Sequence, residues 1–456
     1  MKTLPIRIAA LVMVLAPAGA AQEKAKRPNV LMLFSDDQRF DTVHALGNGE
    51  IRTPVLDSLV RDGTAFTRAY IMGSNQGAVC VPSRAMLHTG RNLFHIARGI
   101  PADTPLWGEV FRRAGYVTHG IGKWHNGPPS YARGFEGGAE VFFGGMSDQN
   151  RVRVQDFDPA GKYPKSRERV GGKFSTELFC DAAVKFLEGH RGDRPFFLYV
   201  ALTSPHDPRT PPKEYADLYD PEKLALPPSF LPEHPFDNGE LQVRDEKLAP
   251  WPRTPGVIRR HIADYYGMIS HLDAEFGRLL EVLKKTGRAE DTVVIFAGDN
   301  GLALGRHGLM GKQSVYDHSV HVPLLMAGPG VPRGRRVDAS CYLLDVFPTA
   351  CALAGVPAPE GLDGLCLVPL LKGEKEKVRD TLFFAYRDFQ RAVQDGRWKL
   401  IEYSVKGQRT TQLFDLAGDP WETKNLADDP ANAKELARLR EELAAWRKRV
   451  NDPGLK

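Results

Sequence analysis

Oxygen-bearing side chains at two distant points of the chain could bind a hard metal ion. Asp36 and Asp37 follow the apolar run NVLMLFS, and Asp299 and Asn300 follow the apolar run TVVIFAG. Carboxylate and amide oxygens favour calcium or magnesium over zinc. A Gly-Asp-Asn-Gly step alone is more often a simple turn. The two acidic pairs together predict a metal site, because three gathered carboxylates without a cation would repel one another.

Nitrogen-bearing side chains form a second candidate set. Lys123 and His125 end the segment YVTHGIGKWHNG, His206 ends PFFLYVALTSPHDP, and Lys312 lies in the Gly-flanked segment GRHGLMGKQS. Any one of them alone is more often a solvated lysine or a hydrogen-bonded histidine. Collected beside a divalent cation, they would neutralise the oxygens of an oxyanion and supply a proton to a leaving group.

A single cysteine stands in the segment GAVCVPSRAMLHTGR. Cys80 precedes a Val-Pro-Ser-Arg step, and Pro82 is tolerated in the first turn of a helix, so we expect Cys80 at the positive end of a helix that faces the metal. A thiolate could be an ordinary nucleophile there. Sulfur, however, is a soft ligand that is poorly matched to calcium or magnesium. The mismatch suggests that the working atom at this position is oxygen.

Four apolar, β-rich runs must position these polar clusters, because each run ends directly at one of them. Helical stretches such as 174–188 and 258–285 separate the runs, which is typical of buried parallel strands in an α/β sheet. Ligands collect at the carboxyl ends of such strands. We therefore predict a large, mostly parallel sheet flanked by helices, with all four clusters at one edge.

The C-terminal part of the chain has a different pattern. After a predicted helix over residues 338–357, residues 381–416 show short alternating runs, and the turn-like Asp395-Gly396 predicts an antiparallel hairpin. A Leu-, Glu- and Arg-rich helix from about 432 to 449 closes the chain. We predict a catalytic domain over residues 27–373 and a smaller C-terminal subdomain over residues 374–456.

The first residues predict export. Lys2 and Arg7 precede an apolar run that ends in small residues, so residues 1–21 have the pattern of a secretory signal peptide. The run is too short to span a bilayer, and no cysteine follows it to carry a lipid. A net charge of +5 without a dense basic stripe argues against a nucleic-acid partner. We expect a periplasmic or secreted protein without stable membrane insertion.

The five cysteines show no metal-ligand spacing. Their number is odd for an exported protein, so at least one thiol is unpaired. Cys80 lies among Gly, Ser and Pro and is therefore the poorest candidate for a buried structural thiol. The sequence does not decide whether the other four form disulfides; these are Cys180, Cys341, Cys351 and Cys366.

The sequence resembles the type I sulfatases of the alkaline phosphatase superfamily. The stretch from Cys80 to Arg84, continued by Leu87, Thr89, Gly90 and Arg91, matches their signature. The likeness extends over nearly the whole mature chain and includes LFSDDQ, GKWH, SPHDP, GDNG, LLDVFPT and QLFDLAGDPWETKNLA. The resemblance implies an alkaline phosphatase-like fold and oxidation of Cys80 to formylglycine, an aldehyde that hydrates to a geminal diol.

The resemblance also implies a role for each candidate residue. The metal, Ca²⁺ with Mg²⁺ as a possibility, would be held by Asp36, Asp37, Asp299, Asn300 and the modified Cys80. Arg84 would steady the modified side chain, Lys123 would bind sulfate and the diol, and His125 would take a proton in the elimination step. His206 and Lys312 would stabilise or protonate the departing oxygen. A formylglycine-generating or anaerobic maturation enzyme would read Pro82 and Ser83 in the nascent chain.

These observations favour an exported sulfatase that acts on sulfate monoesters, in particular of a sulfated sugar or glycan. One alternative is a phosphonate monoester or phosphodiester hydrolase with the same modified nucleophile. Another is a catalytically silent sulfoglycan-binding protein, although none of the candidate residues is lost. An unmodified thiol hydrolase fits less well, because a cysteine-histidine pair does not explain the oxygen-rich metal site.

Overall fold

The four apolar runs form the centre of the main sheet. In a computed structural model that describes residues 27–96 and 98–455, they are β1 (Asn29–Ser35), β4 (Val117–Lys123), β8 (Phe196–Ala201) and β9 (Thr292–Gly298). β1 is parallel to both β8 and β9, and β4 is parallel to β8. The carboxyl ends of the four strands therefore meet at one edge of the sheet, as the sequence predicted.

The main sheet contains nine strands in the order β11-β2-β10-β9-β1-β8-β4-β5, with β12 paired to β2. β10 (His321–Ala327) runs antiparallel to β9 and to β2 (Gly63–Tyr70). The other strands of this sheet are β5 (Gly137–Phe142), β11 (Arg335–Val337) and β12 (Cys341–Tyr342). The prediction of a mixed, mostly parallel sheet is confirmed.

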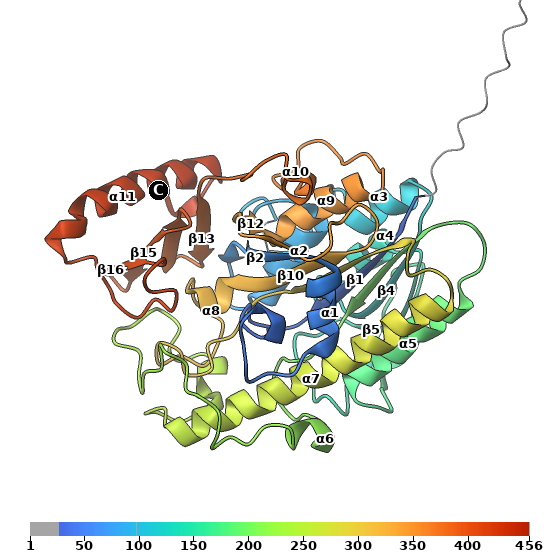
Figure 1. The fold of residues 1–456 in the computed structure, drawn as a ribbon, viewed down its shortest axis with the longest axis horizontal. Helices are drawn as coiled ribbons and strands as arrows, with labels where there is room; N and C mark the ends of the chain where they lie inside the picture. Colours follow the sequence, from blue (N-terminus) through green and yellow to red (C-terminus); the bar gives the residue numbers. More distant parts are fainter. Residues whose placement is uncertain (1–26, 97, 456) are drawn as a thin grey trace, which may run out of the picture.

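Helices cover both faces of this sheet (Figure 1). One face carries α1 (Pro54–Asp62), α5 (Ser175–Gly189) and α7 (Pro255–Lys285), and the other carries α2 (Cys80–Thr89), α3 (Trp107–Arg113) and α9 (Val346–Leu353). Side chains of β1 alternate between the two cores: Val30, Met32 and Phe34 enter one, and Leu31 and Leu33 enter the other. Burial on both faces explains the continuous apolar run of β1.

The predicted helices are found with one correction. α5 and α7 match the predictions at 174–188 and 258–285. The predicted helix over 338–357 is wrong in its first half, where Cys341 and Tyr342 form β12 and pair with β2. The Asp345 carboxylate accepts a hydrogen bond from the backbone N–H of Tyr342 at 2.8 Å, which caps a short 3-10 helix over Leu343–Asp345, and α9 follows from Val346.

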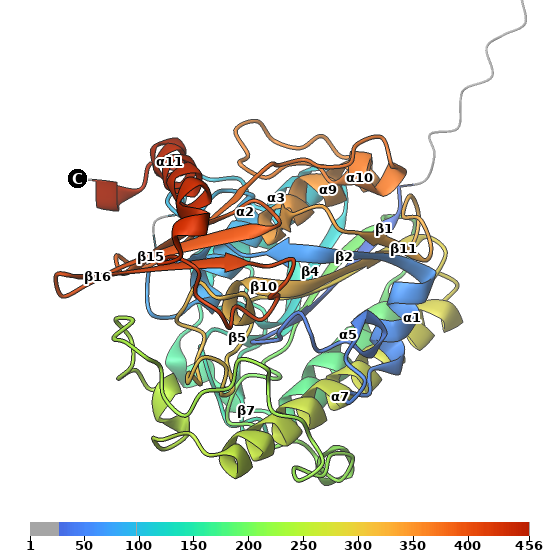
Figure 2. The ribbon, with the colours of Figure 1, turned by 60° about the vertical axis from the view of Figure 1, so that its left-hand side comes forward.

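The C-terminal part forms its own antiparallel sheet, closed by the helix α11 (Ala433–Arg449), as predicted (Figure 2). Its strands are β13 (Leu382–Tyr386), β14 (Gln390–Gln394), β15 (Trp398–Val405) and β16 (Gln408–Asp415). Gly396 connects β14 to β15 with a left-handed φ of 91°, which supports the predicted turn. A fifth strand, β3 (Gly73–Ser74), comes from far upstream and pairs with β13 in parallel. The domain boundary near residue 373 stays a prediction.

Short elements complete the described chain. They are β6 (Arg153–Val154), β7 (Arg169–Val170), α4 (Pro128–Gly134), α6 (Lys213–Ala216), α8 (Asp317–Val320) and α10 (Val368–Lys372). All five cysteines are free thiols. Within the described residues, no helix is both long and apolar enough to cross a membrane. The predicted signal peptide lies outside the described residues.

Asp452 connects the end of the chain to the C-terminal sheet by hydrogen bonds. Its carboxylate accepts hydrogen bonds from Arg391 of β14 at 2.7 and 2.8 Å and from Arg447 of α11 at 2.7 Å. Although burial acts in the opposite direction, the contact with Arg391 lowers the pKa of Asp452 to about 2. The ionised carboxylate therefore stabilises the folded state above its unfolded-state pKa of about 3.9.

We expect Asp452→Asn to lower the free energy of unfolding at pH 7 by about 1–2 kcal/mol. The difference from the wild-type protein should shrink as the pH falls from about 4 towards 2, because the wild-type carboxylate then becomes protonated as well. Urea unfolding across this pH range measures both effects. Asp415→Asn, which removes a surface ion pair with Arg397, is the matched control and should change stability by about 0.5 kcal/mol or less.

Candidate active site

The two acidic pairs predicted to bind metal lie side by side. Asp36 and Asp37 directly follow β1, Asp299 and Asn300 directly follow β9, and the parallel register sets Ser35 opposite Gly298. The backbone N–H of Asp37, which has a left-handed φ of 66°, donates to Asp299 Oδ1 at 2.9 Å. Asn300 Nδ2 donates to Asp37 Oδ1 at 2.8 Å. The sheet register, rather than sequence proximity, brings the pairs together.

The helix α2 brings Cys80 and Arg84 to the same place. The helix begins at Cys80, as predicted, and Cys80 Sγ forms a group with carboxylate oxygens of Asp36 and Asp299 whose atoms all lie within 4.8 Å. One turn later, Arg84 Nε donates to Asp299 Oδ2 at 2.9 Å and Arg84 Nη1 donates to the carbonyl oxygen of Lys123 at 2.8 Å. Arg84 thus links α2 to the ends of β4 and β9.

The end of β4 supplies Lys123 and His125. Lys123 Nζ is completely buried, contacts Asp36 Oδ2, donates to the carbonyl oxygen of Gly145 at 2.6 Å, and lies 3.9 Å from Cys80 Sγ. His125 has a left-handed φ of 59°, and its Nδ1 lies 3.2 Å from Cys80 Sγ. A cation and an imidazole therefore flank Cys80 directly.

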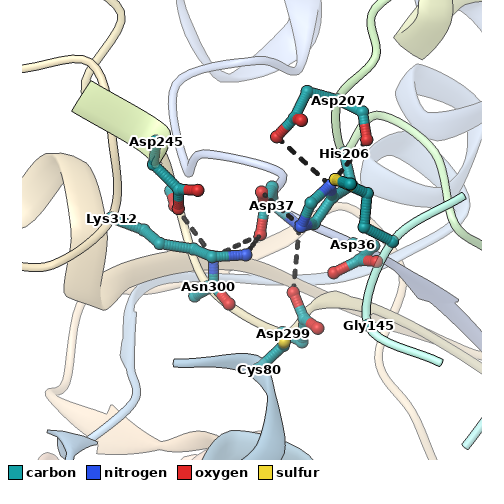
Figure 3. Close-up of polar contacts among 12 residues, drawn as sticks. Asp36, Asp37, Cys80, Gly145, His206, Asp207, Asp245, Asp299, Asn300 and Lys312 are labelled. Atoms are coloured by element: carbon teal, nitrogen blue, oxygen red, sulfur yellow. Dashed lines mark hydrogen bonds and ion pairs between the residues drawn. The ribbon is translucent and has the colours of Figure 1, made fainter. Parts of the chain in front are cut away.

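His206 and Lys312 both approach Asp37 (Figure 3). Lys312 Nζ donates to Asp37 Oδ1 at 2.6 Å, and His206 Nε2 lies 3.7 Å from Asp37 Oδ2. The carbonyl oxygen of Asp207 lies 2.8 Å from His206 Nδ1. Because a carbonyl oxygen can only accept, the proton of the neutral ring is on Nδ1. All the residues predicted for the site thus belong to one connected network.

Three buried oxygens in this network fit a hard cation. Asp36 Oδ1, Asp37 Oδ2 and Asn300 Oδ1 have no hydrogen-bond donor within the described part of the chain. Buried polar atoms in folded proteins nearly always have a partner, so this group of oxygens requires an explanation. Hard divalent cations are bound by oxygens of this kind. The donor set therefore fits the predicted calcium or magnesium ion.

The charges in the site are strongly shifted by burial. Burial, followed by the charge of Asp299, raises the pKa of Asp36 well above its usual value. Burial would also raise the pKa of Asp299. The positive charges of Arg84, Lys123 and Lys312 outweigh this effect and lower the pKa of Asp299 to about 2. Two carboxylates this close repel one another, and a bound cation would relieve the repulsion.

Both active-site histidines are neutral in this arrangement. Burial, with added repulsion from Lys123 and Arg84, lowers the pKa of His125 to about 2. Burial also lowers the pKa of His206 to about 4, although the charge of Asp37 acts in the opposite direction. Burial raises the pKa of the Cys80 thiol despite nearby lysines. The site therefore contains a neutral thiol beside a neutral imidazole.

The structure adds residues that sequence reasoning did not assign. The carbonyl oxygen of Gly145 accepts from Lys123, and Arg244 bonds to the carboxylate of Asp207, with one contact at 3.0 Å. Asp245 Oδ2 accepts from the side-chain amide of Gln313 at 2.8 Å. Asp207 could have been found, because it directly follows His206. Nothing in the local sequence distinguishes Gly145 or Arg244 from ordinary loop residues.

Comparisons with known proteins can now be added to this geometry. The family model described as "Sulfatase" matches residues 28–356, which include every residue of the network. The chain belongs to the sulfatase family. A second model, described as the C-terminal part of N-sulphoglucosamine sulphohydrolase, matches residues 305–449. The protein is therefore a sulfuric ester hydrolase, as the sequence predicted.

Individual relatives of this sulfatase agree with the assignment. It is 28% identical to an ulvan-active sulfatase of Formosa agariphila over 93% of this chain and 81% of that protein. A solved structure in complex with its substrate, D-glucosamine-2-N,6-O-disulfate, superposes with a TM-score of 0.80 over 94% of this chain and all of that chain. At 22% identity, this second likeness shows the fold alone.

A phosphonate monoester hydrolase of Agrobacterium radiobacter also has this fold. It is 25% identical, with a TM-score of 0.76 over 93% of this sulfatase and 96% of that chain. Because the fold is shared, hydrolysis of phosphonate monoesters is the reaction with which sulfate ester hydrolysis has to be compared.

Proposed function

We propose that the protein hydrolyses sulfate monoesters of sulfated saccharides through a hydrated aldehyde at position 80, beside a bound divalent cation, after export from the cytoplasm. The observation that carries the proposal is the placement of Cys80 at the start of α2, among oxygens of Asp36 and Asp299 and next to Lys123 and His125. A soft thiol is mismatched to a site built from oxygen donors. Oxidation to formylglycine and hydration would replace sulfur by oxygen at this point.

The proposed reaction begins with attack of the residue-80 diol on sulfur. One diol oxygen forms a bond to sulfur while the bond from sulfur to the alcohol oxygen breaks. Lys123, buried beside Cys80, binds the sulfate oxygens and the diol. Arg84 cannot move away, because Asp299 and the Lys123 carbonyl oxygen fix its guanidinium. The fixed guanidinium steadies the residue-80 side chain, while the Lys123 cation stabilises the charge that develops on the sulfate in the transition state.

The departing alcohol oxygen leaves towards His206 and Lys312, which both approach the Asp37 carboxylate. Lys312 donates a hydrogen bond to that oxygen. Neutral His206 has its proton on Nδ1, so its Nε2 is free to take up the proton that the attacking hydroxyl loses and to pass it to the departing oxygen. The divalent cation, when bound by Asp36, Asp37, Asp299 and Asn300, polarises the ester and favours the ionised diol.

The second half of the reaction restores the aldehyde. His125 Nδ1, 3.2 Å from the residue-80 side-chain atom, takes the proton of the remaining hydroxyl. The oxygen that loses this proton forms a carbonyl, and the carbon–oxygen bond to sulfate breaks, so that sulfate leaves. Water then hydrates the aldehyde. A plain serine has no second hydroxyl and would stop at its sulfate ester.

Two observations support a saccharide substrate and an exported protein. A relative that matches 93% of this chain is an ulvan-active sulfatase. The N-terminal residues have the pattern of a secretory signal. The periplasm or the exterior is where a large sulfated polymer would be encountered, and the maturation enzyme would act before or during export.

The competing function is hydrolysis of phosphonate monoesters, which the likeness to the Agrobacterium radiobacter enzyme favours. We expect protein produced with a maturation enzyme to contain the aldehyde or its hydrate at residue 80. Its kcat/KM for an aryl sulfate should be at least about tenfold above its kcat/KM for the matching aryl phosphonate monoester. Mass spectrometry of the residue-80 peptide and paired kinetics measure both. An intact thiol in fully active protein would overturn the mechanism, and a preference for the phosphonate would reverse the assignment.

A further inference from the structure

A cavity of about 790 Å³ lies outside the active site. It is partly open to solvent and is lined by the loop that follows Asp37, the end of β2, residues 225–228, the start of β10 and loops of the C-terminal sheet. Within the described chain, none of the residues assigned above to metal binding or catalysis lines it. Its volume is that of a typical small-molecule site. The proposed reaction leaves this cavity without a role.

Aromatic rings form one part of the lining. Phe40 stacks on His321 at 3.9 Å between ring centroids, and Tyr70 stacks on the same imidazole at 4.4 Å. Trp421 is half-buried and lies under the Arg306 guanidinium, 4.6 Å from the ring centroid. Phe40 and Trp421 are only half-buried, so their rings present apolar surface onto which the C–H face of a pyranose can pack.

Besides His321 Nδ1, which lies 3.5 Å from the Asp317 carboxylate, two buried polar atoms of the lining lack a hydrogen-bond partner within the described residues. They are Arg306 Nε, a donor on a side chain 5% exposed, and Gln394 Oε1, an acceptor on a side chain 1% exposed. Leaving such atoms unpaired destabilises the folded state, so their presence in one cavity points to a ligand or water that pairs with them. A hydroxyl group can donate and accept at once, so a hydroxyl-rich molecule suits both atoms.

The charges of the lining argue against a simple anion site. Arg39 and Arg306 share the single carboxylate of Asp41, which compensates one of their two positive charges. Glu50 and Asp338 also line the cavity. In all, four arginines and four carboxylates line the cavity, so its positive and negative charges balance; they are Arg39, Arg68, Arg306 and Arg336, and Asp41, Glu50, Asp317 and Asp338. Such a lining offers donors and acceptors to uncharged hydroxyls rather than a net field to an anion.

We propose that this cavity is a second, non-catalytic saccharide-binding site, which holds a sugar unit by its hydroxyls and its C–H face. The saccharide class of this ligand rests on the proposed function. A polymer bound here would present its sulfate esters to the active site at a raised local concentration. Recognition through hydroxyls makes binding independent of sulfate groups.

Desulfated oligosaccharides of ulvan, carrageenan and heparin are the direct probes, because they lack the ester that the active site requires. We expect at least one of them to bind the full-length, metal-loaded protein in a calorimetric titration. Trp421→Ala should weaken this binding about fivefold or more and leave kcat/KM for a small aryl sulfate within about twofold of the wild-type value. For the native polymer, the same variant should raise KM with little change in kcat.

Trp398→Ala is the matched control, because Trp398 is a half-buried tryptophan of the same subdomain that is covered by an arginine, Arg397, and does not line the cavity. It should leave saccharide binding unchanged. If Trp421→Ala fails to fold, hydrogen exchange of the wild-type protein decides: the desulfated probe should protect residues 40–50 and 416–421.

Absence of binding by every desulfated probe, binding unaffected by Trp421→Ala, or protection confined to the active site would each overturn the proposal and leave water as the occupant. Failure of the proposed function gives a different result. In that case the desulfated probe still binds in a Trp421-dependent manner, while the matured protein does not hydrolyse sulfate esters.

Discussion

Cys80→Ser should lower multiple-turnover hydrolysis of an aryl sulfate by about 10³-fold or more and still release up to one equivalent of alcohol per protein. Serine can attack sulfur once, because Lys123 and His125 remain beside it. It has no second hydroxyl through which to expel sulfate, so the enzyme stops as a sulfate ester. The substitution is small and lies at the start of α2, so the fold should be retained.

Rapid-quench kinetics of alcohol release and intact-mass analysis measure this result together. The mass should increase by that of one SO3 unit after reaction, because the serine oxygen becomes the ester oxygen. Cys366→Ser is the control, because Cys366 is a free thiol outside the network, and it should retain wild-type turnover. Sustained turnover by Cys80→Ser, without accumulation of a sulfate ester, would refute the diol mechanism.

Asp299→Ala should abolish tight metal binding and lower stability by roughly 3–5 kcal/mol. Its carboxylate accepts hydrogen bonds from Arg84 and from the backbone of Asp37, and Arg84 is completely buried. Removing the carboxylate leaves that guanidinium with less compensation in a medium that solvates charge poorly. Because the pKa of Asp299 is lowered to about 2, its ionised form stabilises the fold at neutral pH even before metal binds.

Metal analysis and thermal unfolding with and without a chelator separate the two effects. The chelator should lower the Tm of the wild-type protein, since a ligand bound to the folded state stabilises it, but should hardly change the Tm of Asp299→Ala. Asp62→Ala removes a surface carboxylate that pairs with Arg61 and Arg333, and it should keep both metal content and Tm. Unchanged metal content in Asp299→Ala would contradict its assignment as a ligand.

Much of the active site could be predicted because its residues follow strands. A strand buried on both faces appears in the sequence as an apolar run, and its end appears as an abrupt change to polar residues. Asp37, Lys123, His206 and Asp299 all stand at such changes, and parallel strands bring their carboxyl ends to one edge. The position of Cys80 at a helix start was equally visible, because Pro82 lies within the first turn.

Local patterns failed where a long-range contact decided the conformation. Residues 338–357 have the composition of a helix, yet Cys341 and Tyr342 are extended because they pair with β2. The strand β3 is too short to be recognised, and it exists because β13 offers it hydrogen bonds from more than three hundred residues away. In both cases the energy of strand pairing outweighs a weak local preference.

The sequence by itself determined the sheet, the family resemblance and the residues of the reaction centre, because strand periodicity and motif spacing are local properties that can be read along the chain. Only the tertiary structure decided how those residues are paired: Arg84 with Asp299, Lys312 with Asp37, and Lys123 with the Gly145 carbonyl oxygen. It alone revealed the cavity lined by Trp421 and Gln394. A cavity is enclosed by segments from several loops, and no single stretch of sequence carries its shape.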